Sequence, residues 1–210
     1  TQFNVTASSK FGGDGTDGAL NITSGTTTID IASSSYFIKN YTSINVSATG
    51  TLVFTDGNAS GSVVVLKSQG AVTITCTSIP CIDVSAVGGQ GAPTSSVGNT
   101  GTTSTDAIAY FSKVNGGGAG QNNTNGGGGG STSTANYWSD LSIAGKTIKY
   151  SVGGGGGSGG AGASSGTGGK GGNGGGVLII ESGGALNFNA TSGISAAGQI
   201  GQNAVGAGSS

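Results

Sequence analysis

The sequence supplies few side chains that could carry out acid–base or nucleophilic chemistry. Histidine is absent, and Asp and Glu together number eight in 210 residues. A Ser-His or Cys-His pair and an imidazole metal ligand are therefore excluded. Two carboxyl groups can still serve a glycosidase, but no acidic residue stands in a recognisable motif, and each glycine-rich match to a phosphate-binding loop lacks a required position. We expect no enzyme, no catalytic residue and no cofactor.

Two aspartates near the start of the chain are calcium candidates with an incomplete motif. The run Gly12-Gly-Asp-Gly-Thr-Asp-Gly-Ala19 is close to the calcium-binding nonapeptide G-G-x-G-x-D-x-U-x. Ala19 replaces the large aliphatic residue, and no second copy is present to complete the coordination. Asp14 and Asp17 are the candidate ligands, a polar β-turn is the alternative interpretation, and we predict no metal site.

The two cysteines are candidates for a disulfide. Cys76 and Cys81 are five positions apart, with Pro80 beside the second. In an oxidising compartment they would close a short loop and stabilise the fold by constraining the unfolded chain. Two buried thiols in a strand layer are the alternative, and we predict the disulfide.

Seven asparagines begin an Asn-x-Ser/Thr sequence and are candidate glycosylation sites in a secreted protein. Some of these matches arise by chance in a chain so rich in Asn, Ser and Thr. The candidates are Asn4, Asn21, Asn40, Asn45, Asn58, Asn122 and Asn189.

Four aromatic residues between glycine tracts are the candidate contact residues. Aromatic side chains beside glycine turns form rigid, amphipathic surfaces at small entropic cost. The alternative is that they cap the glycine region or lie in a subunit interface. They are Tyr110, Phe111, Tyr137 and Trp138.

Composition and charge exclude several other classes of function. The net charge is −1 and only 7% of residues are charged, so nothing attracts a nucleic acid or an anionic membrane. The longest apolar runs, such as residues 177–180, are far too short to span a bilayer. Glycine accounts for 47 residues, yet the hydrophobic share is 33%, concentrated in short Val/Ile/Leu runs that a β fold could bury.

The hydrophobic pattern predicts strands and no substantial helix. Apolar residues alternate with polar ones over residues 4–87, and the spacers are turn sequences. Residues 66–75 align with residues 180–189, and similar tails begin at Ile82 and Ile194. Repeated units that each leave an apolar face uncovered usually stack. We predict an all-β, stacked β-repeat fold, solenoid-like or sandwich-like.

Between the copies lies a glycine-rich insertion with a period of three. Runs of five glycines occur at residues 126–130 and 153–157. Three residues per turn is the period of a polyproline-II-type helix, and glycine lets such helices pack backbone to backbone. We predict an ordered polyglycine-II-type region, with a β-rich layer at 1–87, the insertion at 88–176 and the second repeat copy at 177–210. The period-three residues are Ser158, Ala161, Ser164, Thr167, Lys170 and Asn173.

Three segments resemble glycine-rich extracellular filament and phage tail-fibre-tip-type surface proteins. They are Phe11-Gly-Gly-Asp-Gly-Thr-Asp-Gly-Ala-Leu20, Tyr41-Thr-Ser-Ile-Asn-Val46 and Gly174-Gly-Gly-Val-Leu-Ile-Ile180. The resemblance implies polyglycine-II packing, and in the tail-fibre proteins connecting loops bind a host receptor.

Two functions fit this pattern. The first is a structural subunit of an extracellular filament or surface appendage, whose partners are copies of itself. Residues 1–9 alternate like a strand that could join a neighbour's sheet edge, and a partner could complete the glycine stretch after Ile194. The alternative is a cell-surface or virion-tail adhesin that binds a receptor or glycan through the aromatic turns.

Overall fold

The computed structural model describes residues 11–85, 87–93, 107–109, 112–114, 139–143, 146–150, 169–189 and 193–201. This part of the chain contains no helix, and about 46% of it is strand, with parallel sheets. The prediction of an all-β fold without substantial helix is therefore confirmed. Among the described residues, no helix has the length and apolar character needed to cross a membrane.

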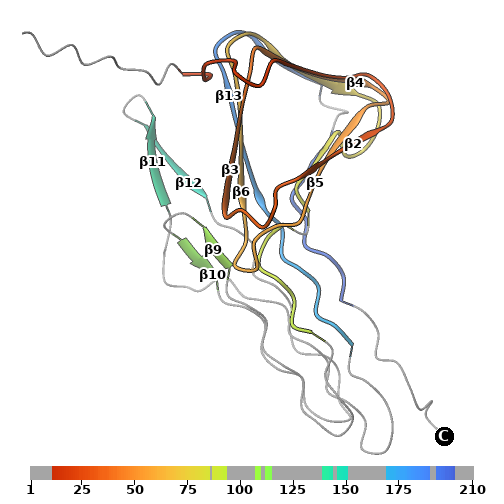
Figure 1. Ribbon diagram of the computed structural model, residues 1–210, viewed down its shortest axis with the longest axis vertical. Helices are drawn as coiled ribbons and strands as arrows, with labels where there is room; N and C mark the ends of the chain where they lie inside the picture. The colour runs from red at the N-terminus through yellow and green to blue at the C-terminus, as the bar shows by residue number, and fades with distance from the viewer. Residues whose placement is uncertain are drawn as a thin grey trace, which may run out of the picture.

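Three parallel sheets surround one core and form the sides of a triangle (Figure 1). Sheet A has the order β1 (Ala19–Ile22), β4 (Ser43–Ala48), β7 (Val72–Cys76) and β14 (Leu186–Phe188). Sheet B has the order β2 (Thr26–Asp30), β5 (Thr51–Thr55), β8 (Ile82–Asp83) and β15 (Ile194–Ser195). Sheet C contains β3 (Tyr36–Tyr41), β6 (Val63–Ser68) and β13 (Val177–Ser182).

The chain visits sheets A, B and C in turn and then returns to sheet A. We call each such passage a coil: β1–β2–β3, β4–β5–β6, β7–β8–β13, and finally β14–β15. Each strand pairs in parallel with its equivalent in the next coil. The pairs Leu66 with Ile180 and Ile82 with Ile194 have the same alignment as the similar segments of the sequence.

Alternate residues of the strands fill the core. Successive side chains of a strand point to opposite faces, so one row of each strand faces inward. Ile44 and Val46 of sheet A, and Leu52 and Phe54 of sheet B, are all at most 2% exposed. Burying one such side chain contributes about 1.5–3 kcal/mol. The Phe54 ring meets the ring of Phe37 from sheet C edge to face, with centroids 6.3 Å apart, so the three sheets share one core.

The corner between sheets C and A is built by a Ser-x-Gly-Ala turn in the second and third coils. The hydroxyl of Ser68 donates to the carbonyl oxygen of Gly70 at 3.2 Å, and that of Ser182 donates to Gly184 at 3.1 Å. The corner carbonyl groups lie outside the hydrogen-bond ladders of the strands, and the serine hydroxyls supply hydrogen-bond donors for them. A Cβ on Gly70 would lie 2.9 Å from the carbonyl oxygen of Thr42, so a side chain there would crowd the preceding coil.

The third coil carries a long insertion at the corner between sheets B and C. The paired residues Tyr36 and Val63 are 27 positions apart, whereas Val63 and Val177 are 114 apart. About 87 extra residues therefore leave the coil after β8 and return at β13. They include the antiparallel pairs β9 (Ala107–Ala109) with β10 (Ser112–Val114), and β11 (Ser139–Ile143) with β12 (Lys146–Tyr150).

The neighbouring isoleucines Ile82 and Ile194 provide a matched test of the core. They occupy equivalent inward positions in adjacent coils, but Ile82 is 0% and Ile194 42% exposed. We expect Ile82→Ala to lower the free energy of unfolding of the monomer by about 2–5 kcal/mol, because it leaves a cavity. Ile194→Ala should lower the free energy of unfolding by much less. Urea denaturation at low protein concentration measures both variants. Equal losses would contradict this assignment of the core.

Candidate functional site

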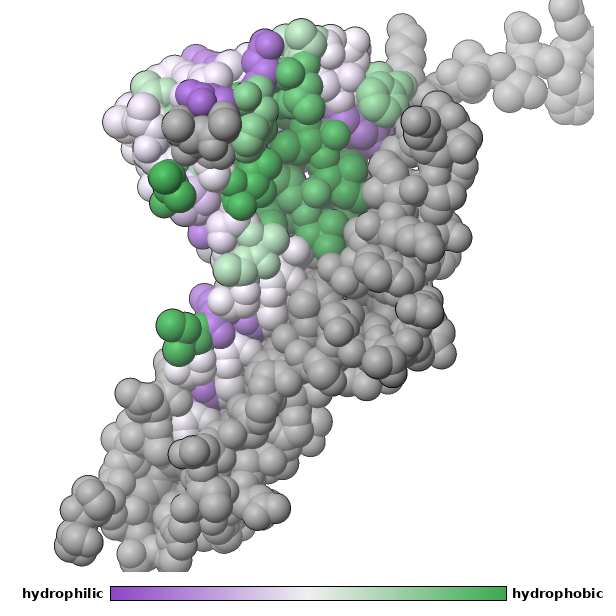
Figure 2. Space-filling model, turned by 180° about the vertical axis from the view of Figure 1, so that it is seen from behind, coloured by the Kyte–Doolittle hydropathy of each residue, from purple (hydrophilic) through white to green (hydrophobic). Residues whose placement is uncertain are grey.

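The end of the core at the fourth coil is open and apolar. Leu186, Phe188 and Ile194 belong to the inward rows, yet they are 58%, 49% and 42% exposed. Their equivalents in the third coil, Val72, Ile74 and Ile82, are all 0% exposed. Figure 2, which views the molecule from behind, shows an apolar surface in the middle of the three-sided part. We call Leu186, Phe188 and Ile194 the open end.

The fourth coil also lacks its third side. Sheets A and B have four strands each, but sheet C has three and ends at β13. After β15 the described chain continues through residues 196–201, which pack beside another glycine-rich segment instead of entering sheet C. One edge of β13 is thus unpaired within the described part of the chain.

The opposite end of the core, at the first coil, carries a lysine in an inward row. Lys39 pairs in register with the buried Leu66, and its Nζ lies 5.9 Å from the centroid of the Phe37 ring. Its charge is balanced by Asp17, whose Oδ1 lies 2.7 Å from Nζ. This role of Lys39 was not predicted, although a charged residue within an alternating apolar strand is a visible signal in the sequence.

The same contacts explain how Asp17 titrates. The hydrogen bond from Lys39 holds the pKa of Asp17 below its usual value, and the backbone N–H of Asn40, which donates to Oδ2 at 2.7 Å, lowers it further. Burial raises the pKa of the Tyr41 hydroxyl, with a smaller contribution from the charge of Asp17.

The two calcium candidates are engaged separately. Asp14 Oδ1 accepts hydrogen bonds from the backbone N–H of Thr16 at 3.1 Å and from its hydroxyl at 2.9 Å, which is a polar turn. Asp17 is instead paired with Lys39. Among the described residues, no group of three or more His, Cys, Asp or Glu side chains could hold a metal ion.

Three glycine-rich segments lie side by side next to the corner between sheets B and C, below the triangle in the view of Figure 1. They are residues 88–93, 169–176 and 196–201. The N–H groups of Gly171 and Gly174 donate to the carbonyls of Ala92 and Gly89 at 2.9 and 2.8 Å. The two donors are three residues apart, and the two acceptors are also three residues apart. The donor number rises from 171 to 174 while the acceptor number falls from 92 to 89. The first two segments are therefore antiparallel, with a repeat of three residues.

Glycine is required where the second and third segments touch. A Cβ on Gly172 would meet the carbonyl oxygen of Gln199, and one on Gly175 would meet that of Ala196. These positions are again three apart. The N–H of Gln199 donates to the Asn173 carbonyl at 2.7 Å between them. Residues 196–201 therefore pack on the chain's own glycine-rich segment 169–176.

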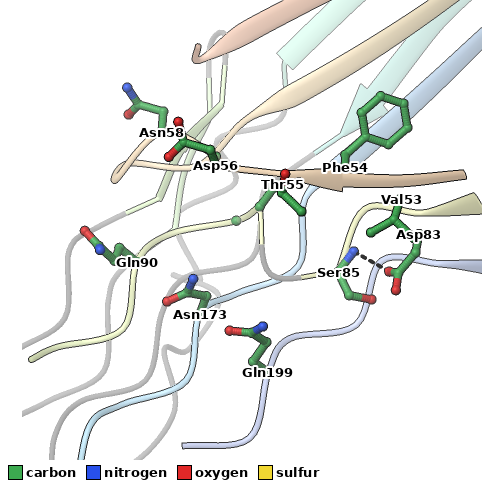
Figure 3. A pocket seen from close by; sticks show the side chains of 13 residues that line it. Val53, Phe54, Thr55, Asp56, Asn58, Asp83, Ser85, Gln90, Asn173 and Gln199 are labelled. Atoms are coloured by element: carbon green, nitrogen blue, oxygen red, sulfur yellow. Dashed lines mark hydrogen bonds between the residues drawn. The ribbon is translucent and has the colours of Figure 1, made fainter. Parts of the chain in front are cut away.

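A polar cleft lies where these segments meet sheet B (Figure 3). It has a volume of about 350 Å³, and each glycine-rich segment contributes one carboxamide side chain to it. Asp83 Oδ1 accepts a hydrogen bond from the Ser85 backbone N–H at 2.7 Å. The carboxylates of Asp56 and Asp83 disfavour anions in the cleft, and its carboxamide side chains can form hydrogen bonds with neutral polar groups. Its polar side chains are Thr55, Asp56, Asn58, Asp83, Ser85, Gln90, Asn173 and Gln199.

Cys76 and Cys81 are fully buried and form a disulfide across the corner between sheets A and B. Their Cα atoms are 5.8 Å apart. The bridge links the end of β7 to the residue before β8, so it closes the corner of the third coil.

The asparagine candidates have different surroundings. Asn58 is engaged, since its Nδ2 donates to the Ser33 carbonyl at 2.9 Å and its Oδ1 accepts from Ser60 N–H. The Asn45 Nδ2 donates to Asn21 Oδ1 at 2.7 Å. Asn40 is half-buried, whereas Asn21 and Asn189 are exposed.

The remaining candidates lie outside the described residues. They are Asn4, Asn122 and the four aromatic contact residues Tyr110, Phe111, Tyr137 and Trp138. A comparison with protein-family models, curated proteins and solved structures finds no match to this chain.

The Asp17–Lys39 pair predicts a pH-dependent contribution to stability. Because the folded-state pKa of Asp17 is lowered, the contribution is present above the usual carboxyl range and is lost as pH falls through the folded-state pKa. We expect Asp17→Asn to reduce the free energy of unfolding by up to about 1 kcal/mol near neutral pH, as for a partly exposed pair. Thermal melts should show this difference shrinking below about pH 4. In a Lys39→Met background the same change should have a smaller effect at neutral pH, and an unchanged effect would contradict the pairing.

The glycine contacts predict strong sensitivity to a β-branched side chain. We expect Gly175→Val to separate residues 169–176 from residues 196–201, because its Cβ would overlap the Ala196 carbonyl. Hydrogen exchange at Gln199 should then rise. Ala197→Val adds bulk to an exposed residue of the same segment and is the control. Equal exchange in both variants would show that the segments are not packed in this way.

Proposed function

We propose that this chain is a non-enzymatic structural subunit of an extracellular filament or surface appendage. In this proposal the coils form a β-solenoid of stacked repeats, the insertion is an ordered polyglycine-II-type region, and copies of the chain join end to end. The observation that carries the proposal is the open end, where Leu186, Phe188 and Ile194 lie half exposed although their equivalents one coil earlier are buried.

The direction of the strands determines what kind of assembly can cover this end. All pairs within sheets A, B and C are parallel, so a second copy continues the pattern only if its first coil follows the fourth coil of the first copy. In that arrangement β14 would pair with the neighbour's β1, and β15 with its β2. A head-to-tail contact of this kind repeats without closing and gives a filament.

The first coil is suited to receive such a neighbour. Leu20, Ile29 and Phe37 pack against the core and are only partly buried, so they offer apolar surface at that end. The lysine charge beside them is neutralised by Asp17 at 2.7 Å, which reduces the cost of covering it. An uncompensated charge at the same place would oppose association.

The glycine-rich segments supply a second surface for packing between subunits. Three residues per turn is the repeat of polyglycine II, and the hydrogen bonds of Gly171 and Gly174 have that spacing. Segments without Cβ atoms can add further neighbours through the same backbone groups. We therefore assign the glycine-rich region to subunit packing, in addition to the ends of the coils.

An extracellular or cell-surface location fits the chemistry of the described residues. The Cys76–Cys81 disulfide is a bond that persists in oxidising compartments. Asn21 and Asn189 are exposed and begin glycosylation sequences, which act only in secreted chains.

An adhesin on a cell surface or virion tail is the second candidate. The antiparallel segments 88–93 and 169–176 lead into and out of the stretch that holds Tyr110, Phe111, Tyr137 and Trp138. Those aromatic residues would then be presented to a receptor or glycan at the far end of the insertion. This candidate shares the fold but needs no contact between the ends of the coils.

Charge substitution at the open end tests the filament proposal. We expect Ile194→Asp to abolish concentration-dependent assembly of the purified protein, measured by light scattering and electron microscopy, because the carboxylate would be buried against a neighbour. Ile79→Asp is the control, since Ile79 is 78% exposed at the corner between sheets A and B and lies outside both the inward rows and the glycine-rich segments.

Assembly that survives Ile194→Asp, or a wild-type chain that stays monomeric at every concentration, would contradict the filament proposal. The second of these results, combined with binding to cells that requires Trp138, would support the adhesin.

A further inference from the structure

We infer that the polar cleft between sheet B and the glycine-rich segments is a binding site for a neutral saccharide. The residues that line the cleft all belong to the described part of the chain. A saccharide site goes beyond the proposed structural role and does not depend on it, because the cleft is formed within a single chain.

The outer face of sheet B forms one wall of the cleft. Val53 of β5 points away from the core, because the next residue, Phe54, is buried in it. Asp83 of β8 pairs in register with Val53 and so faces the same way. In Figure 3 the Phe54 ring and the Gln199 side chain lie on opposite sides of β5. The cleft therefore lies outside the core, and a ligand there would not disturb the packing of the coils.

The glycine-rich segments form the other wall, and hydrogen bonds hold them in place. The N–H of Gln90 donates to the Ala59 carbonyl at 2.8 Å. The N–H of Gln199 donates to the Asn173 carbonyl at 2.7 Å, and the N–H of Gly91 donates to Asn173 Oδ1 at 2.9 Å. The backbone positions from which the two glutamine side chains extend are therefore fixed, so binding has to order only the side chains.

Part of the polar lining is committed to the fold. The Asn58 side chain donates through Nδ2 to the Ser33 carbonyl at 2.9 Å and accepts the Ser60 N–H through Oδ1 at 2.9 Å. The Ser85 hydroxyl oxygen lies 2.6 Å from that of Ser195. These groups give the cleft its shape, and we do not assign them to ligand contacts.

Four other side chains of the cleft keep hydrogen-bonding capacity for a ligand. Asp83 accepts a backbone N–H through Oδ1 at 2.7 Å, and Asp56 accepts a serine hydroxyl through Oδ1 at 3.3 Å. In the described part of the chain, the Oδ2 atoms of both aspartates accept no hydrogen bond. The exposed carboxamides of Gln90 and Gln199 likewise form none with the described residues. The cleft thus presents two carboxylate acceptors and two groups that both donate and accept.

This mixture of groups matches the hydroxyl groups of a sugar ring. A hydroxyl group can donate one hydrogen bond and accept others, so neighbouring hydroxyls of one ring can donate to the aspartates and accept from the glutamines. Val53, half-buried in the same wall, offers an apolar contact to the C–H groups of the ring. The volume of about 350 Å³ is at the small end of the range of ligand sites, about 300–1,000 Å³, which suits a small saccharide.

Other classes of ligand match the cleft less well. The two carboxylates repel an anion. An apolar ligand would take water from the four polar side chains without replacing its hydrogen bonds, which is costly. Among the described residues no three His, Cys, Asp or Glu side chains are grouped to hold a metal ion. A neutral polyhydroxyl compound is the class that pairs with both the acceptors and the donors.

Titration of the isotope-labelled protein with the methyl glycosides of glucose, galactose and mannose, followed by NMR, tests the site. We expect at least one glycoside to bind and to shift the backbone amide signals of Gly88, Gln90 and Gln199. The double variant Gln90→Ala/Gln199→Ala should weaken that binding by about tenfold or more. Its melting temperature should stay the same, because both side chains are exposed. Gln69→Ala, at an exposed position of the corner between sheets C and A, is the matched control and should leave binding unchanged.

Asp83→Asn provides a second readout. It keeps an oxygen that can accept the Ser85 N–H but removes the charged acceptor, so we expect weaker glycoside binding in a folded protein. If none of the three glycosides shifts the cleft amides, or if binding survives both the glutamine double variant and Asp83→Asn, the assignment is overturned. Amide shifts confined to other parts of the chain would also overturn it. These titrations use dilute protein, so their outcome is independent of whether the chain forms filaments.

Discussion

The structure depends on parallel pairing of each strand with its equivalent one coil away. This pairing places like residues side by side, so an inward apolar row continues from coil to coil and each coil buries the row of its neighbour. A coil at the end of the stack has no such neighbour. The exposed Leu186, Phe188 and Ile194 are the direct result, and the need to cover them underlies the proposed assembly.

A second constraint governs the described glycine-rich segments 88–93, 169–176 and 196–201, where backbone groups make the contacts that side chains make in the coils. Glycine-rich segments cannot bury apolar side chains, so their order must come from N–H and C=O groups that satisfy one another. The three-residue spacing of the Gly171 and Gly174 donors lets adjacent segments do this, and the close approach at Gly172 and Gly175 leaves no room for a Cβ. The insertion is attached at one corner of the third coil, so the coils keep their pairing around it.

The sequence revealed part of this arrangement. Alternating apolar residues predicted an all-β fold without substantial helix, which is confirmed, and the similarity of residues 66–75 to 180–189 has the register in which β6 and β7 pair with β13 and β14. The first two coils were not recognised as copies of the repeat. Their corners differ in length, and equivalent positions in the coils share burial more often than they share the same residue type. The open end was not predicted for a related reason. It follows from the lack of a described sheet C strand after Ile194, which can be recognised only once each earlier coil is known to have three strands. The polar cleft combines residues from four distant segments, which no local pattern could bring together.

The central claim is that the coils continue from one copy of the chain to the next. X-ray fibre diffraction from oriented assemblies of the purified protein tests it most directly. Because strands lie across the axis along which coils stack, the account predicts a reflection near 4.8 Å on the meridian, along the fibre axis. The same reflection on the equator would mean that strands run along the fibre, and would contradict end-to-end joining of the coils.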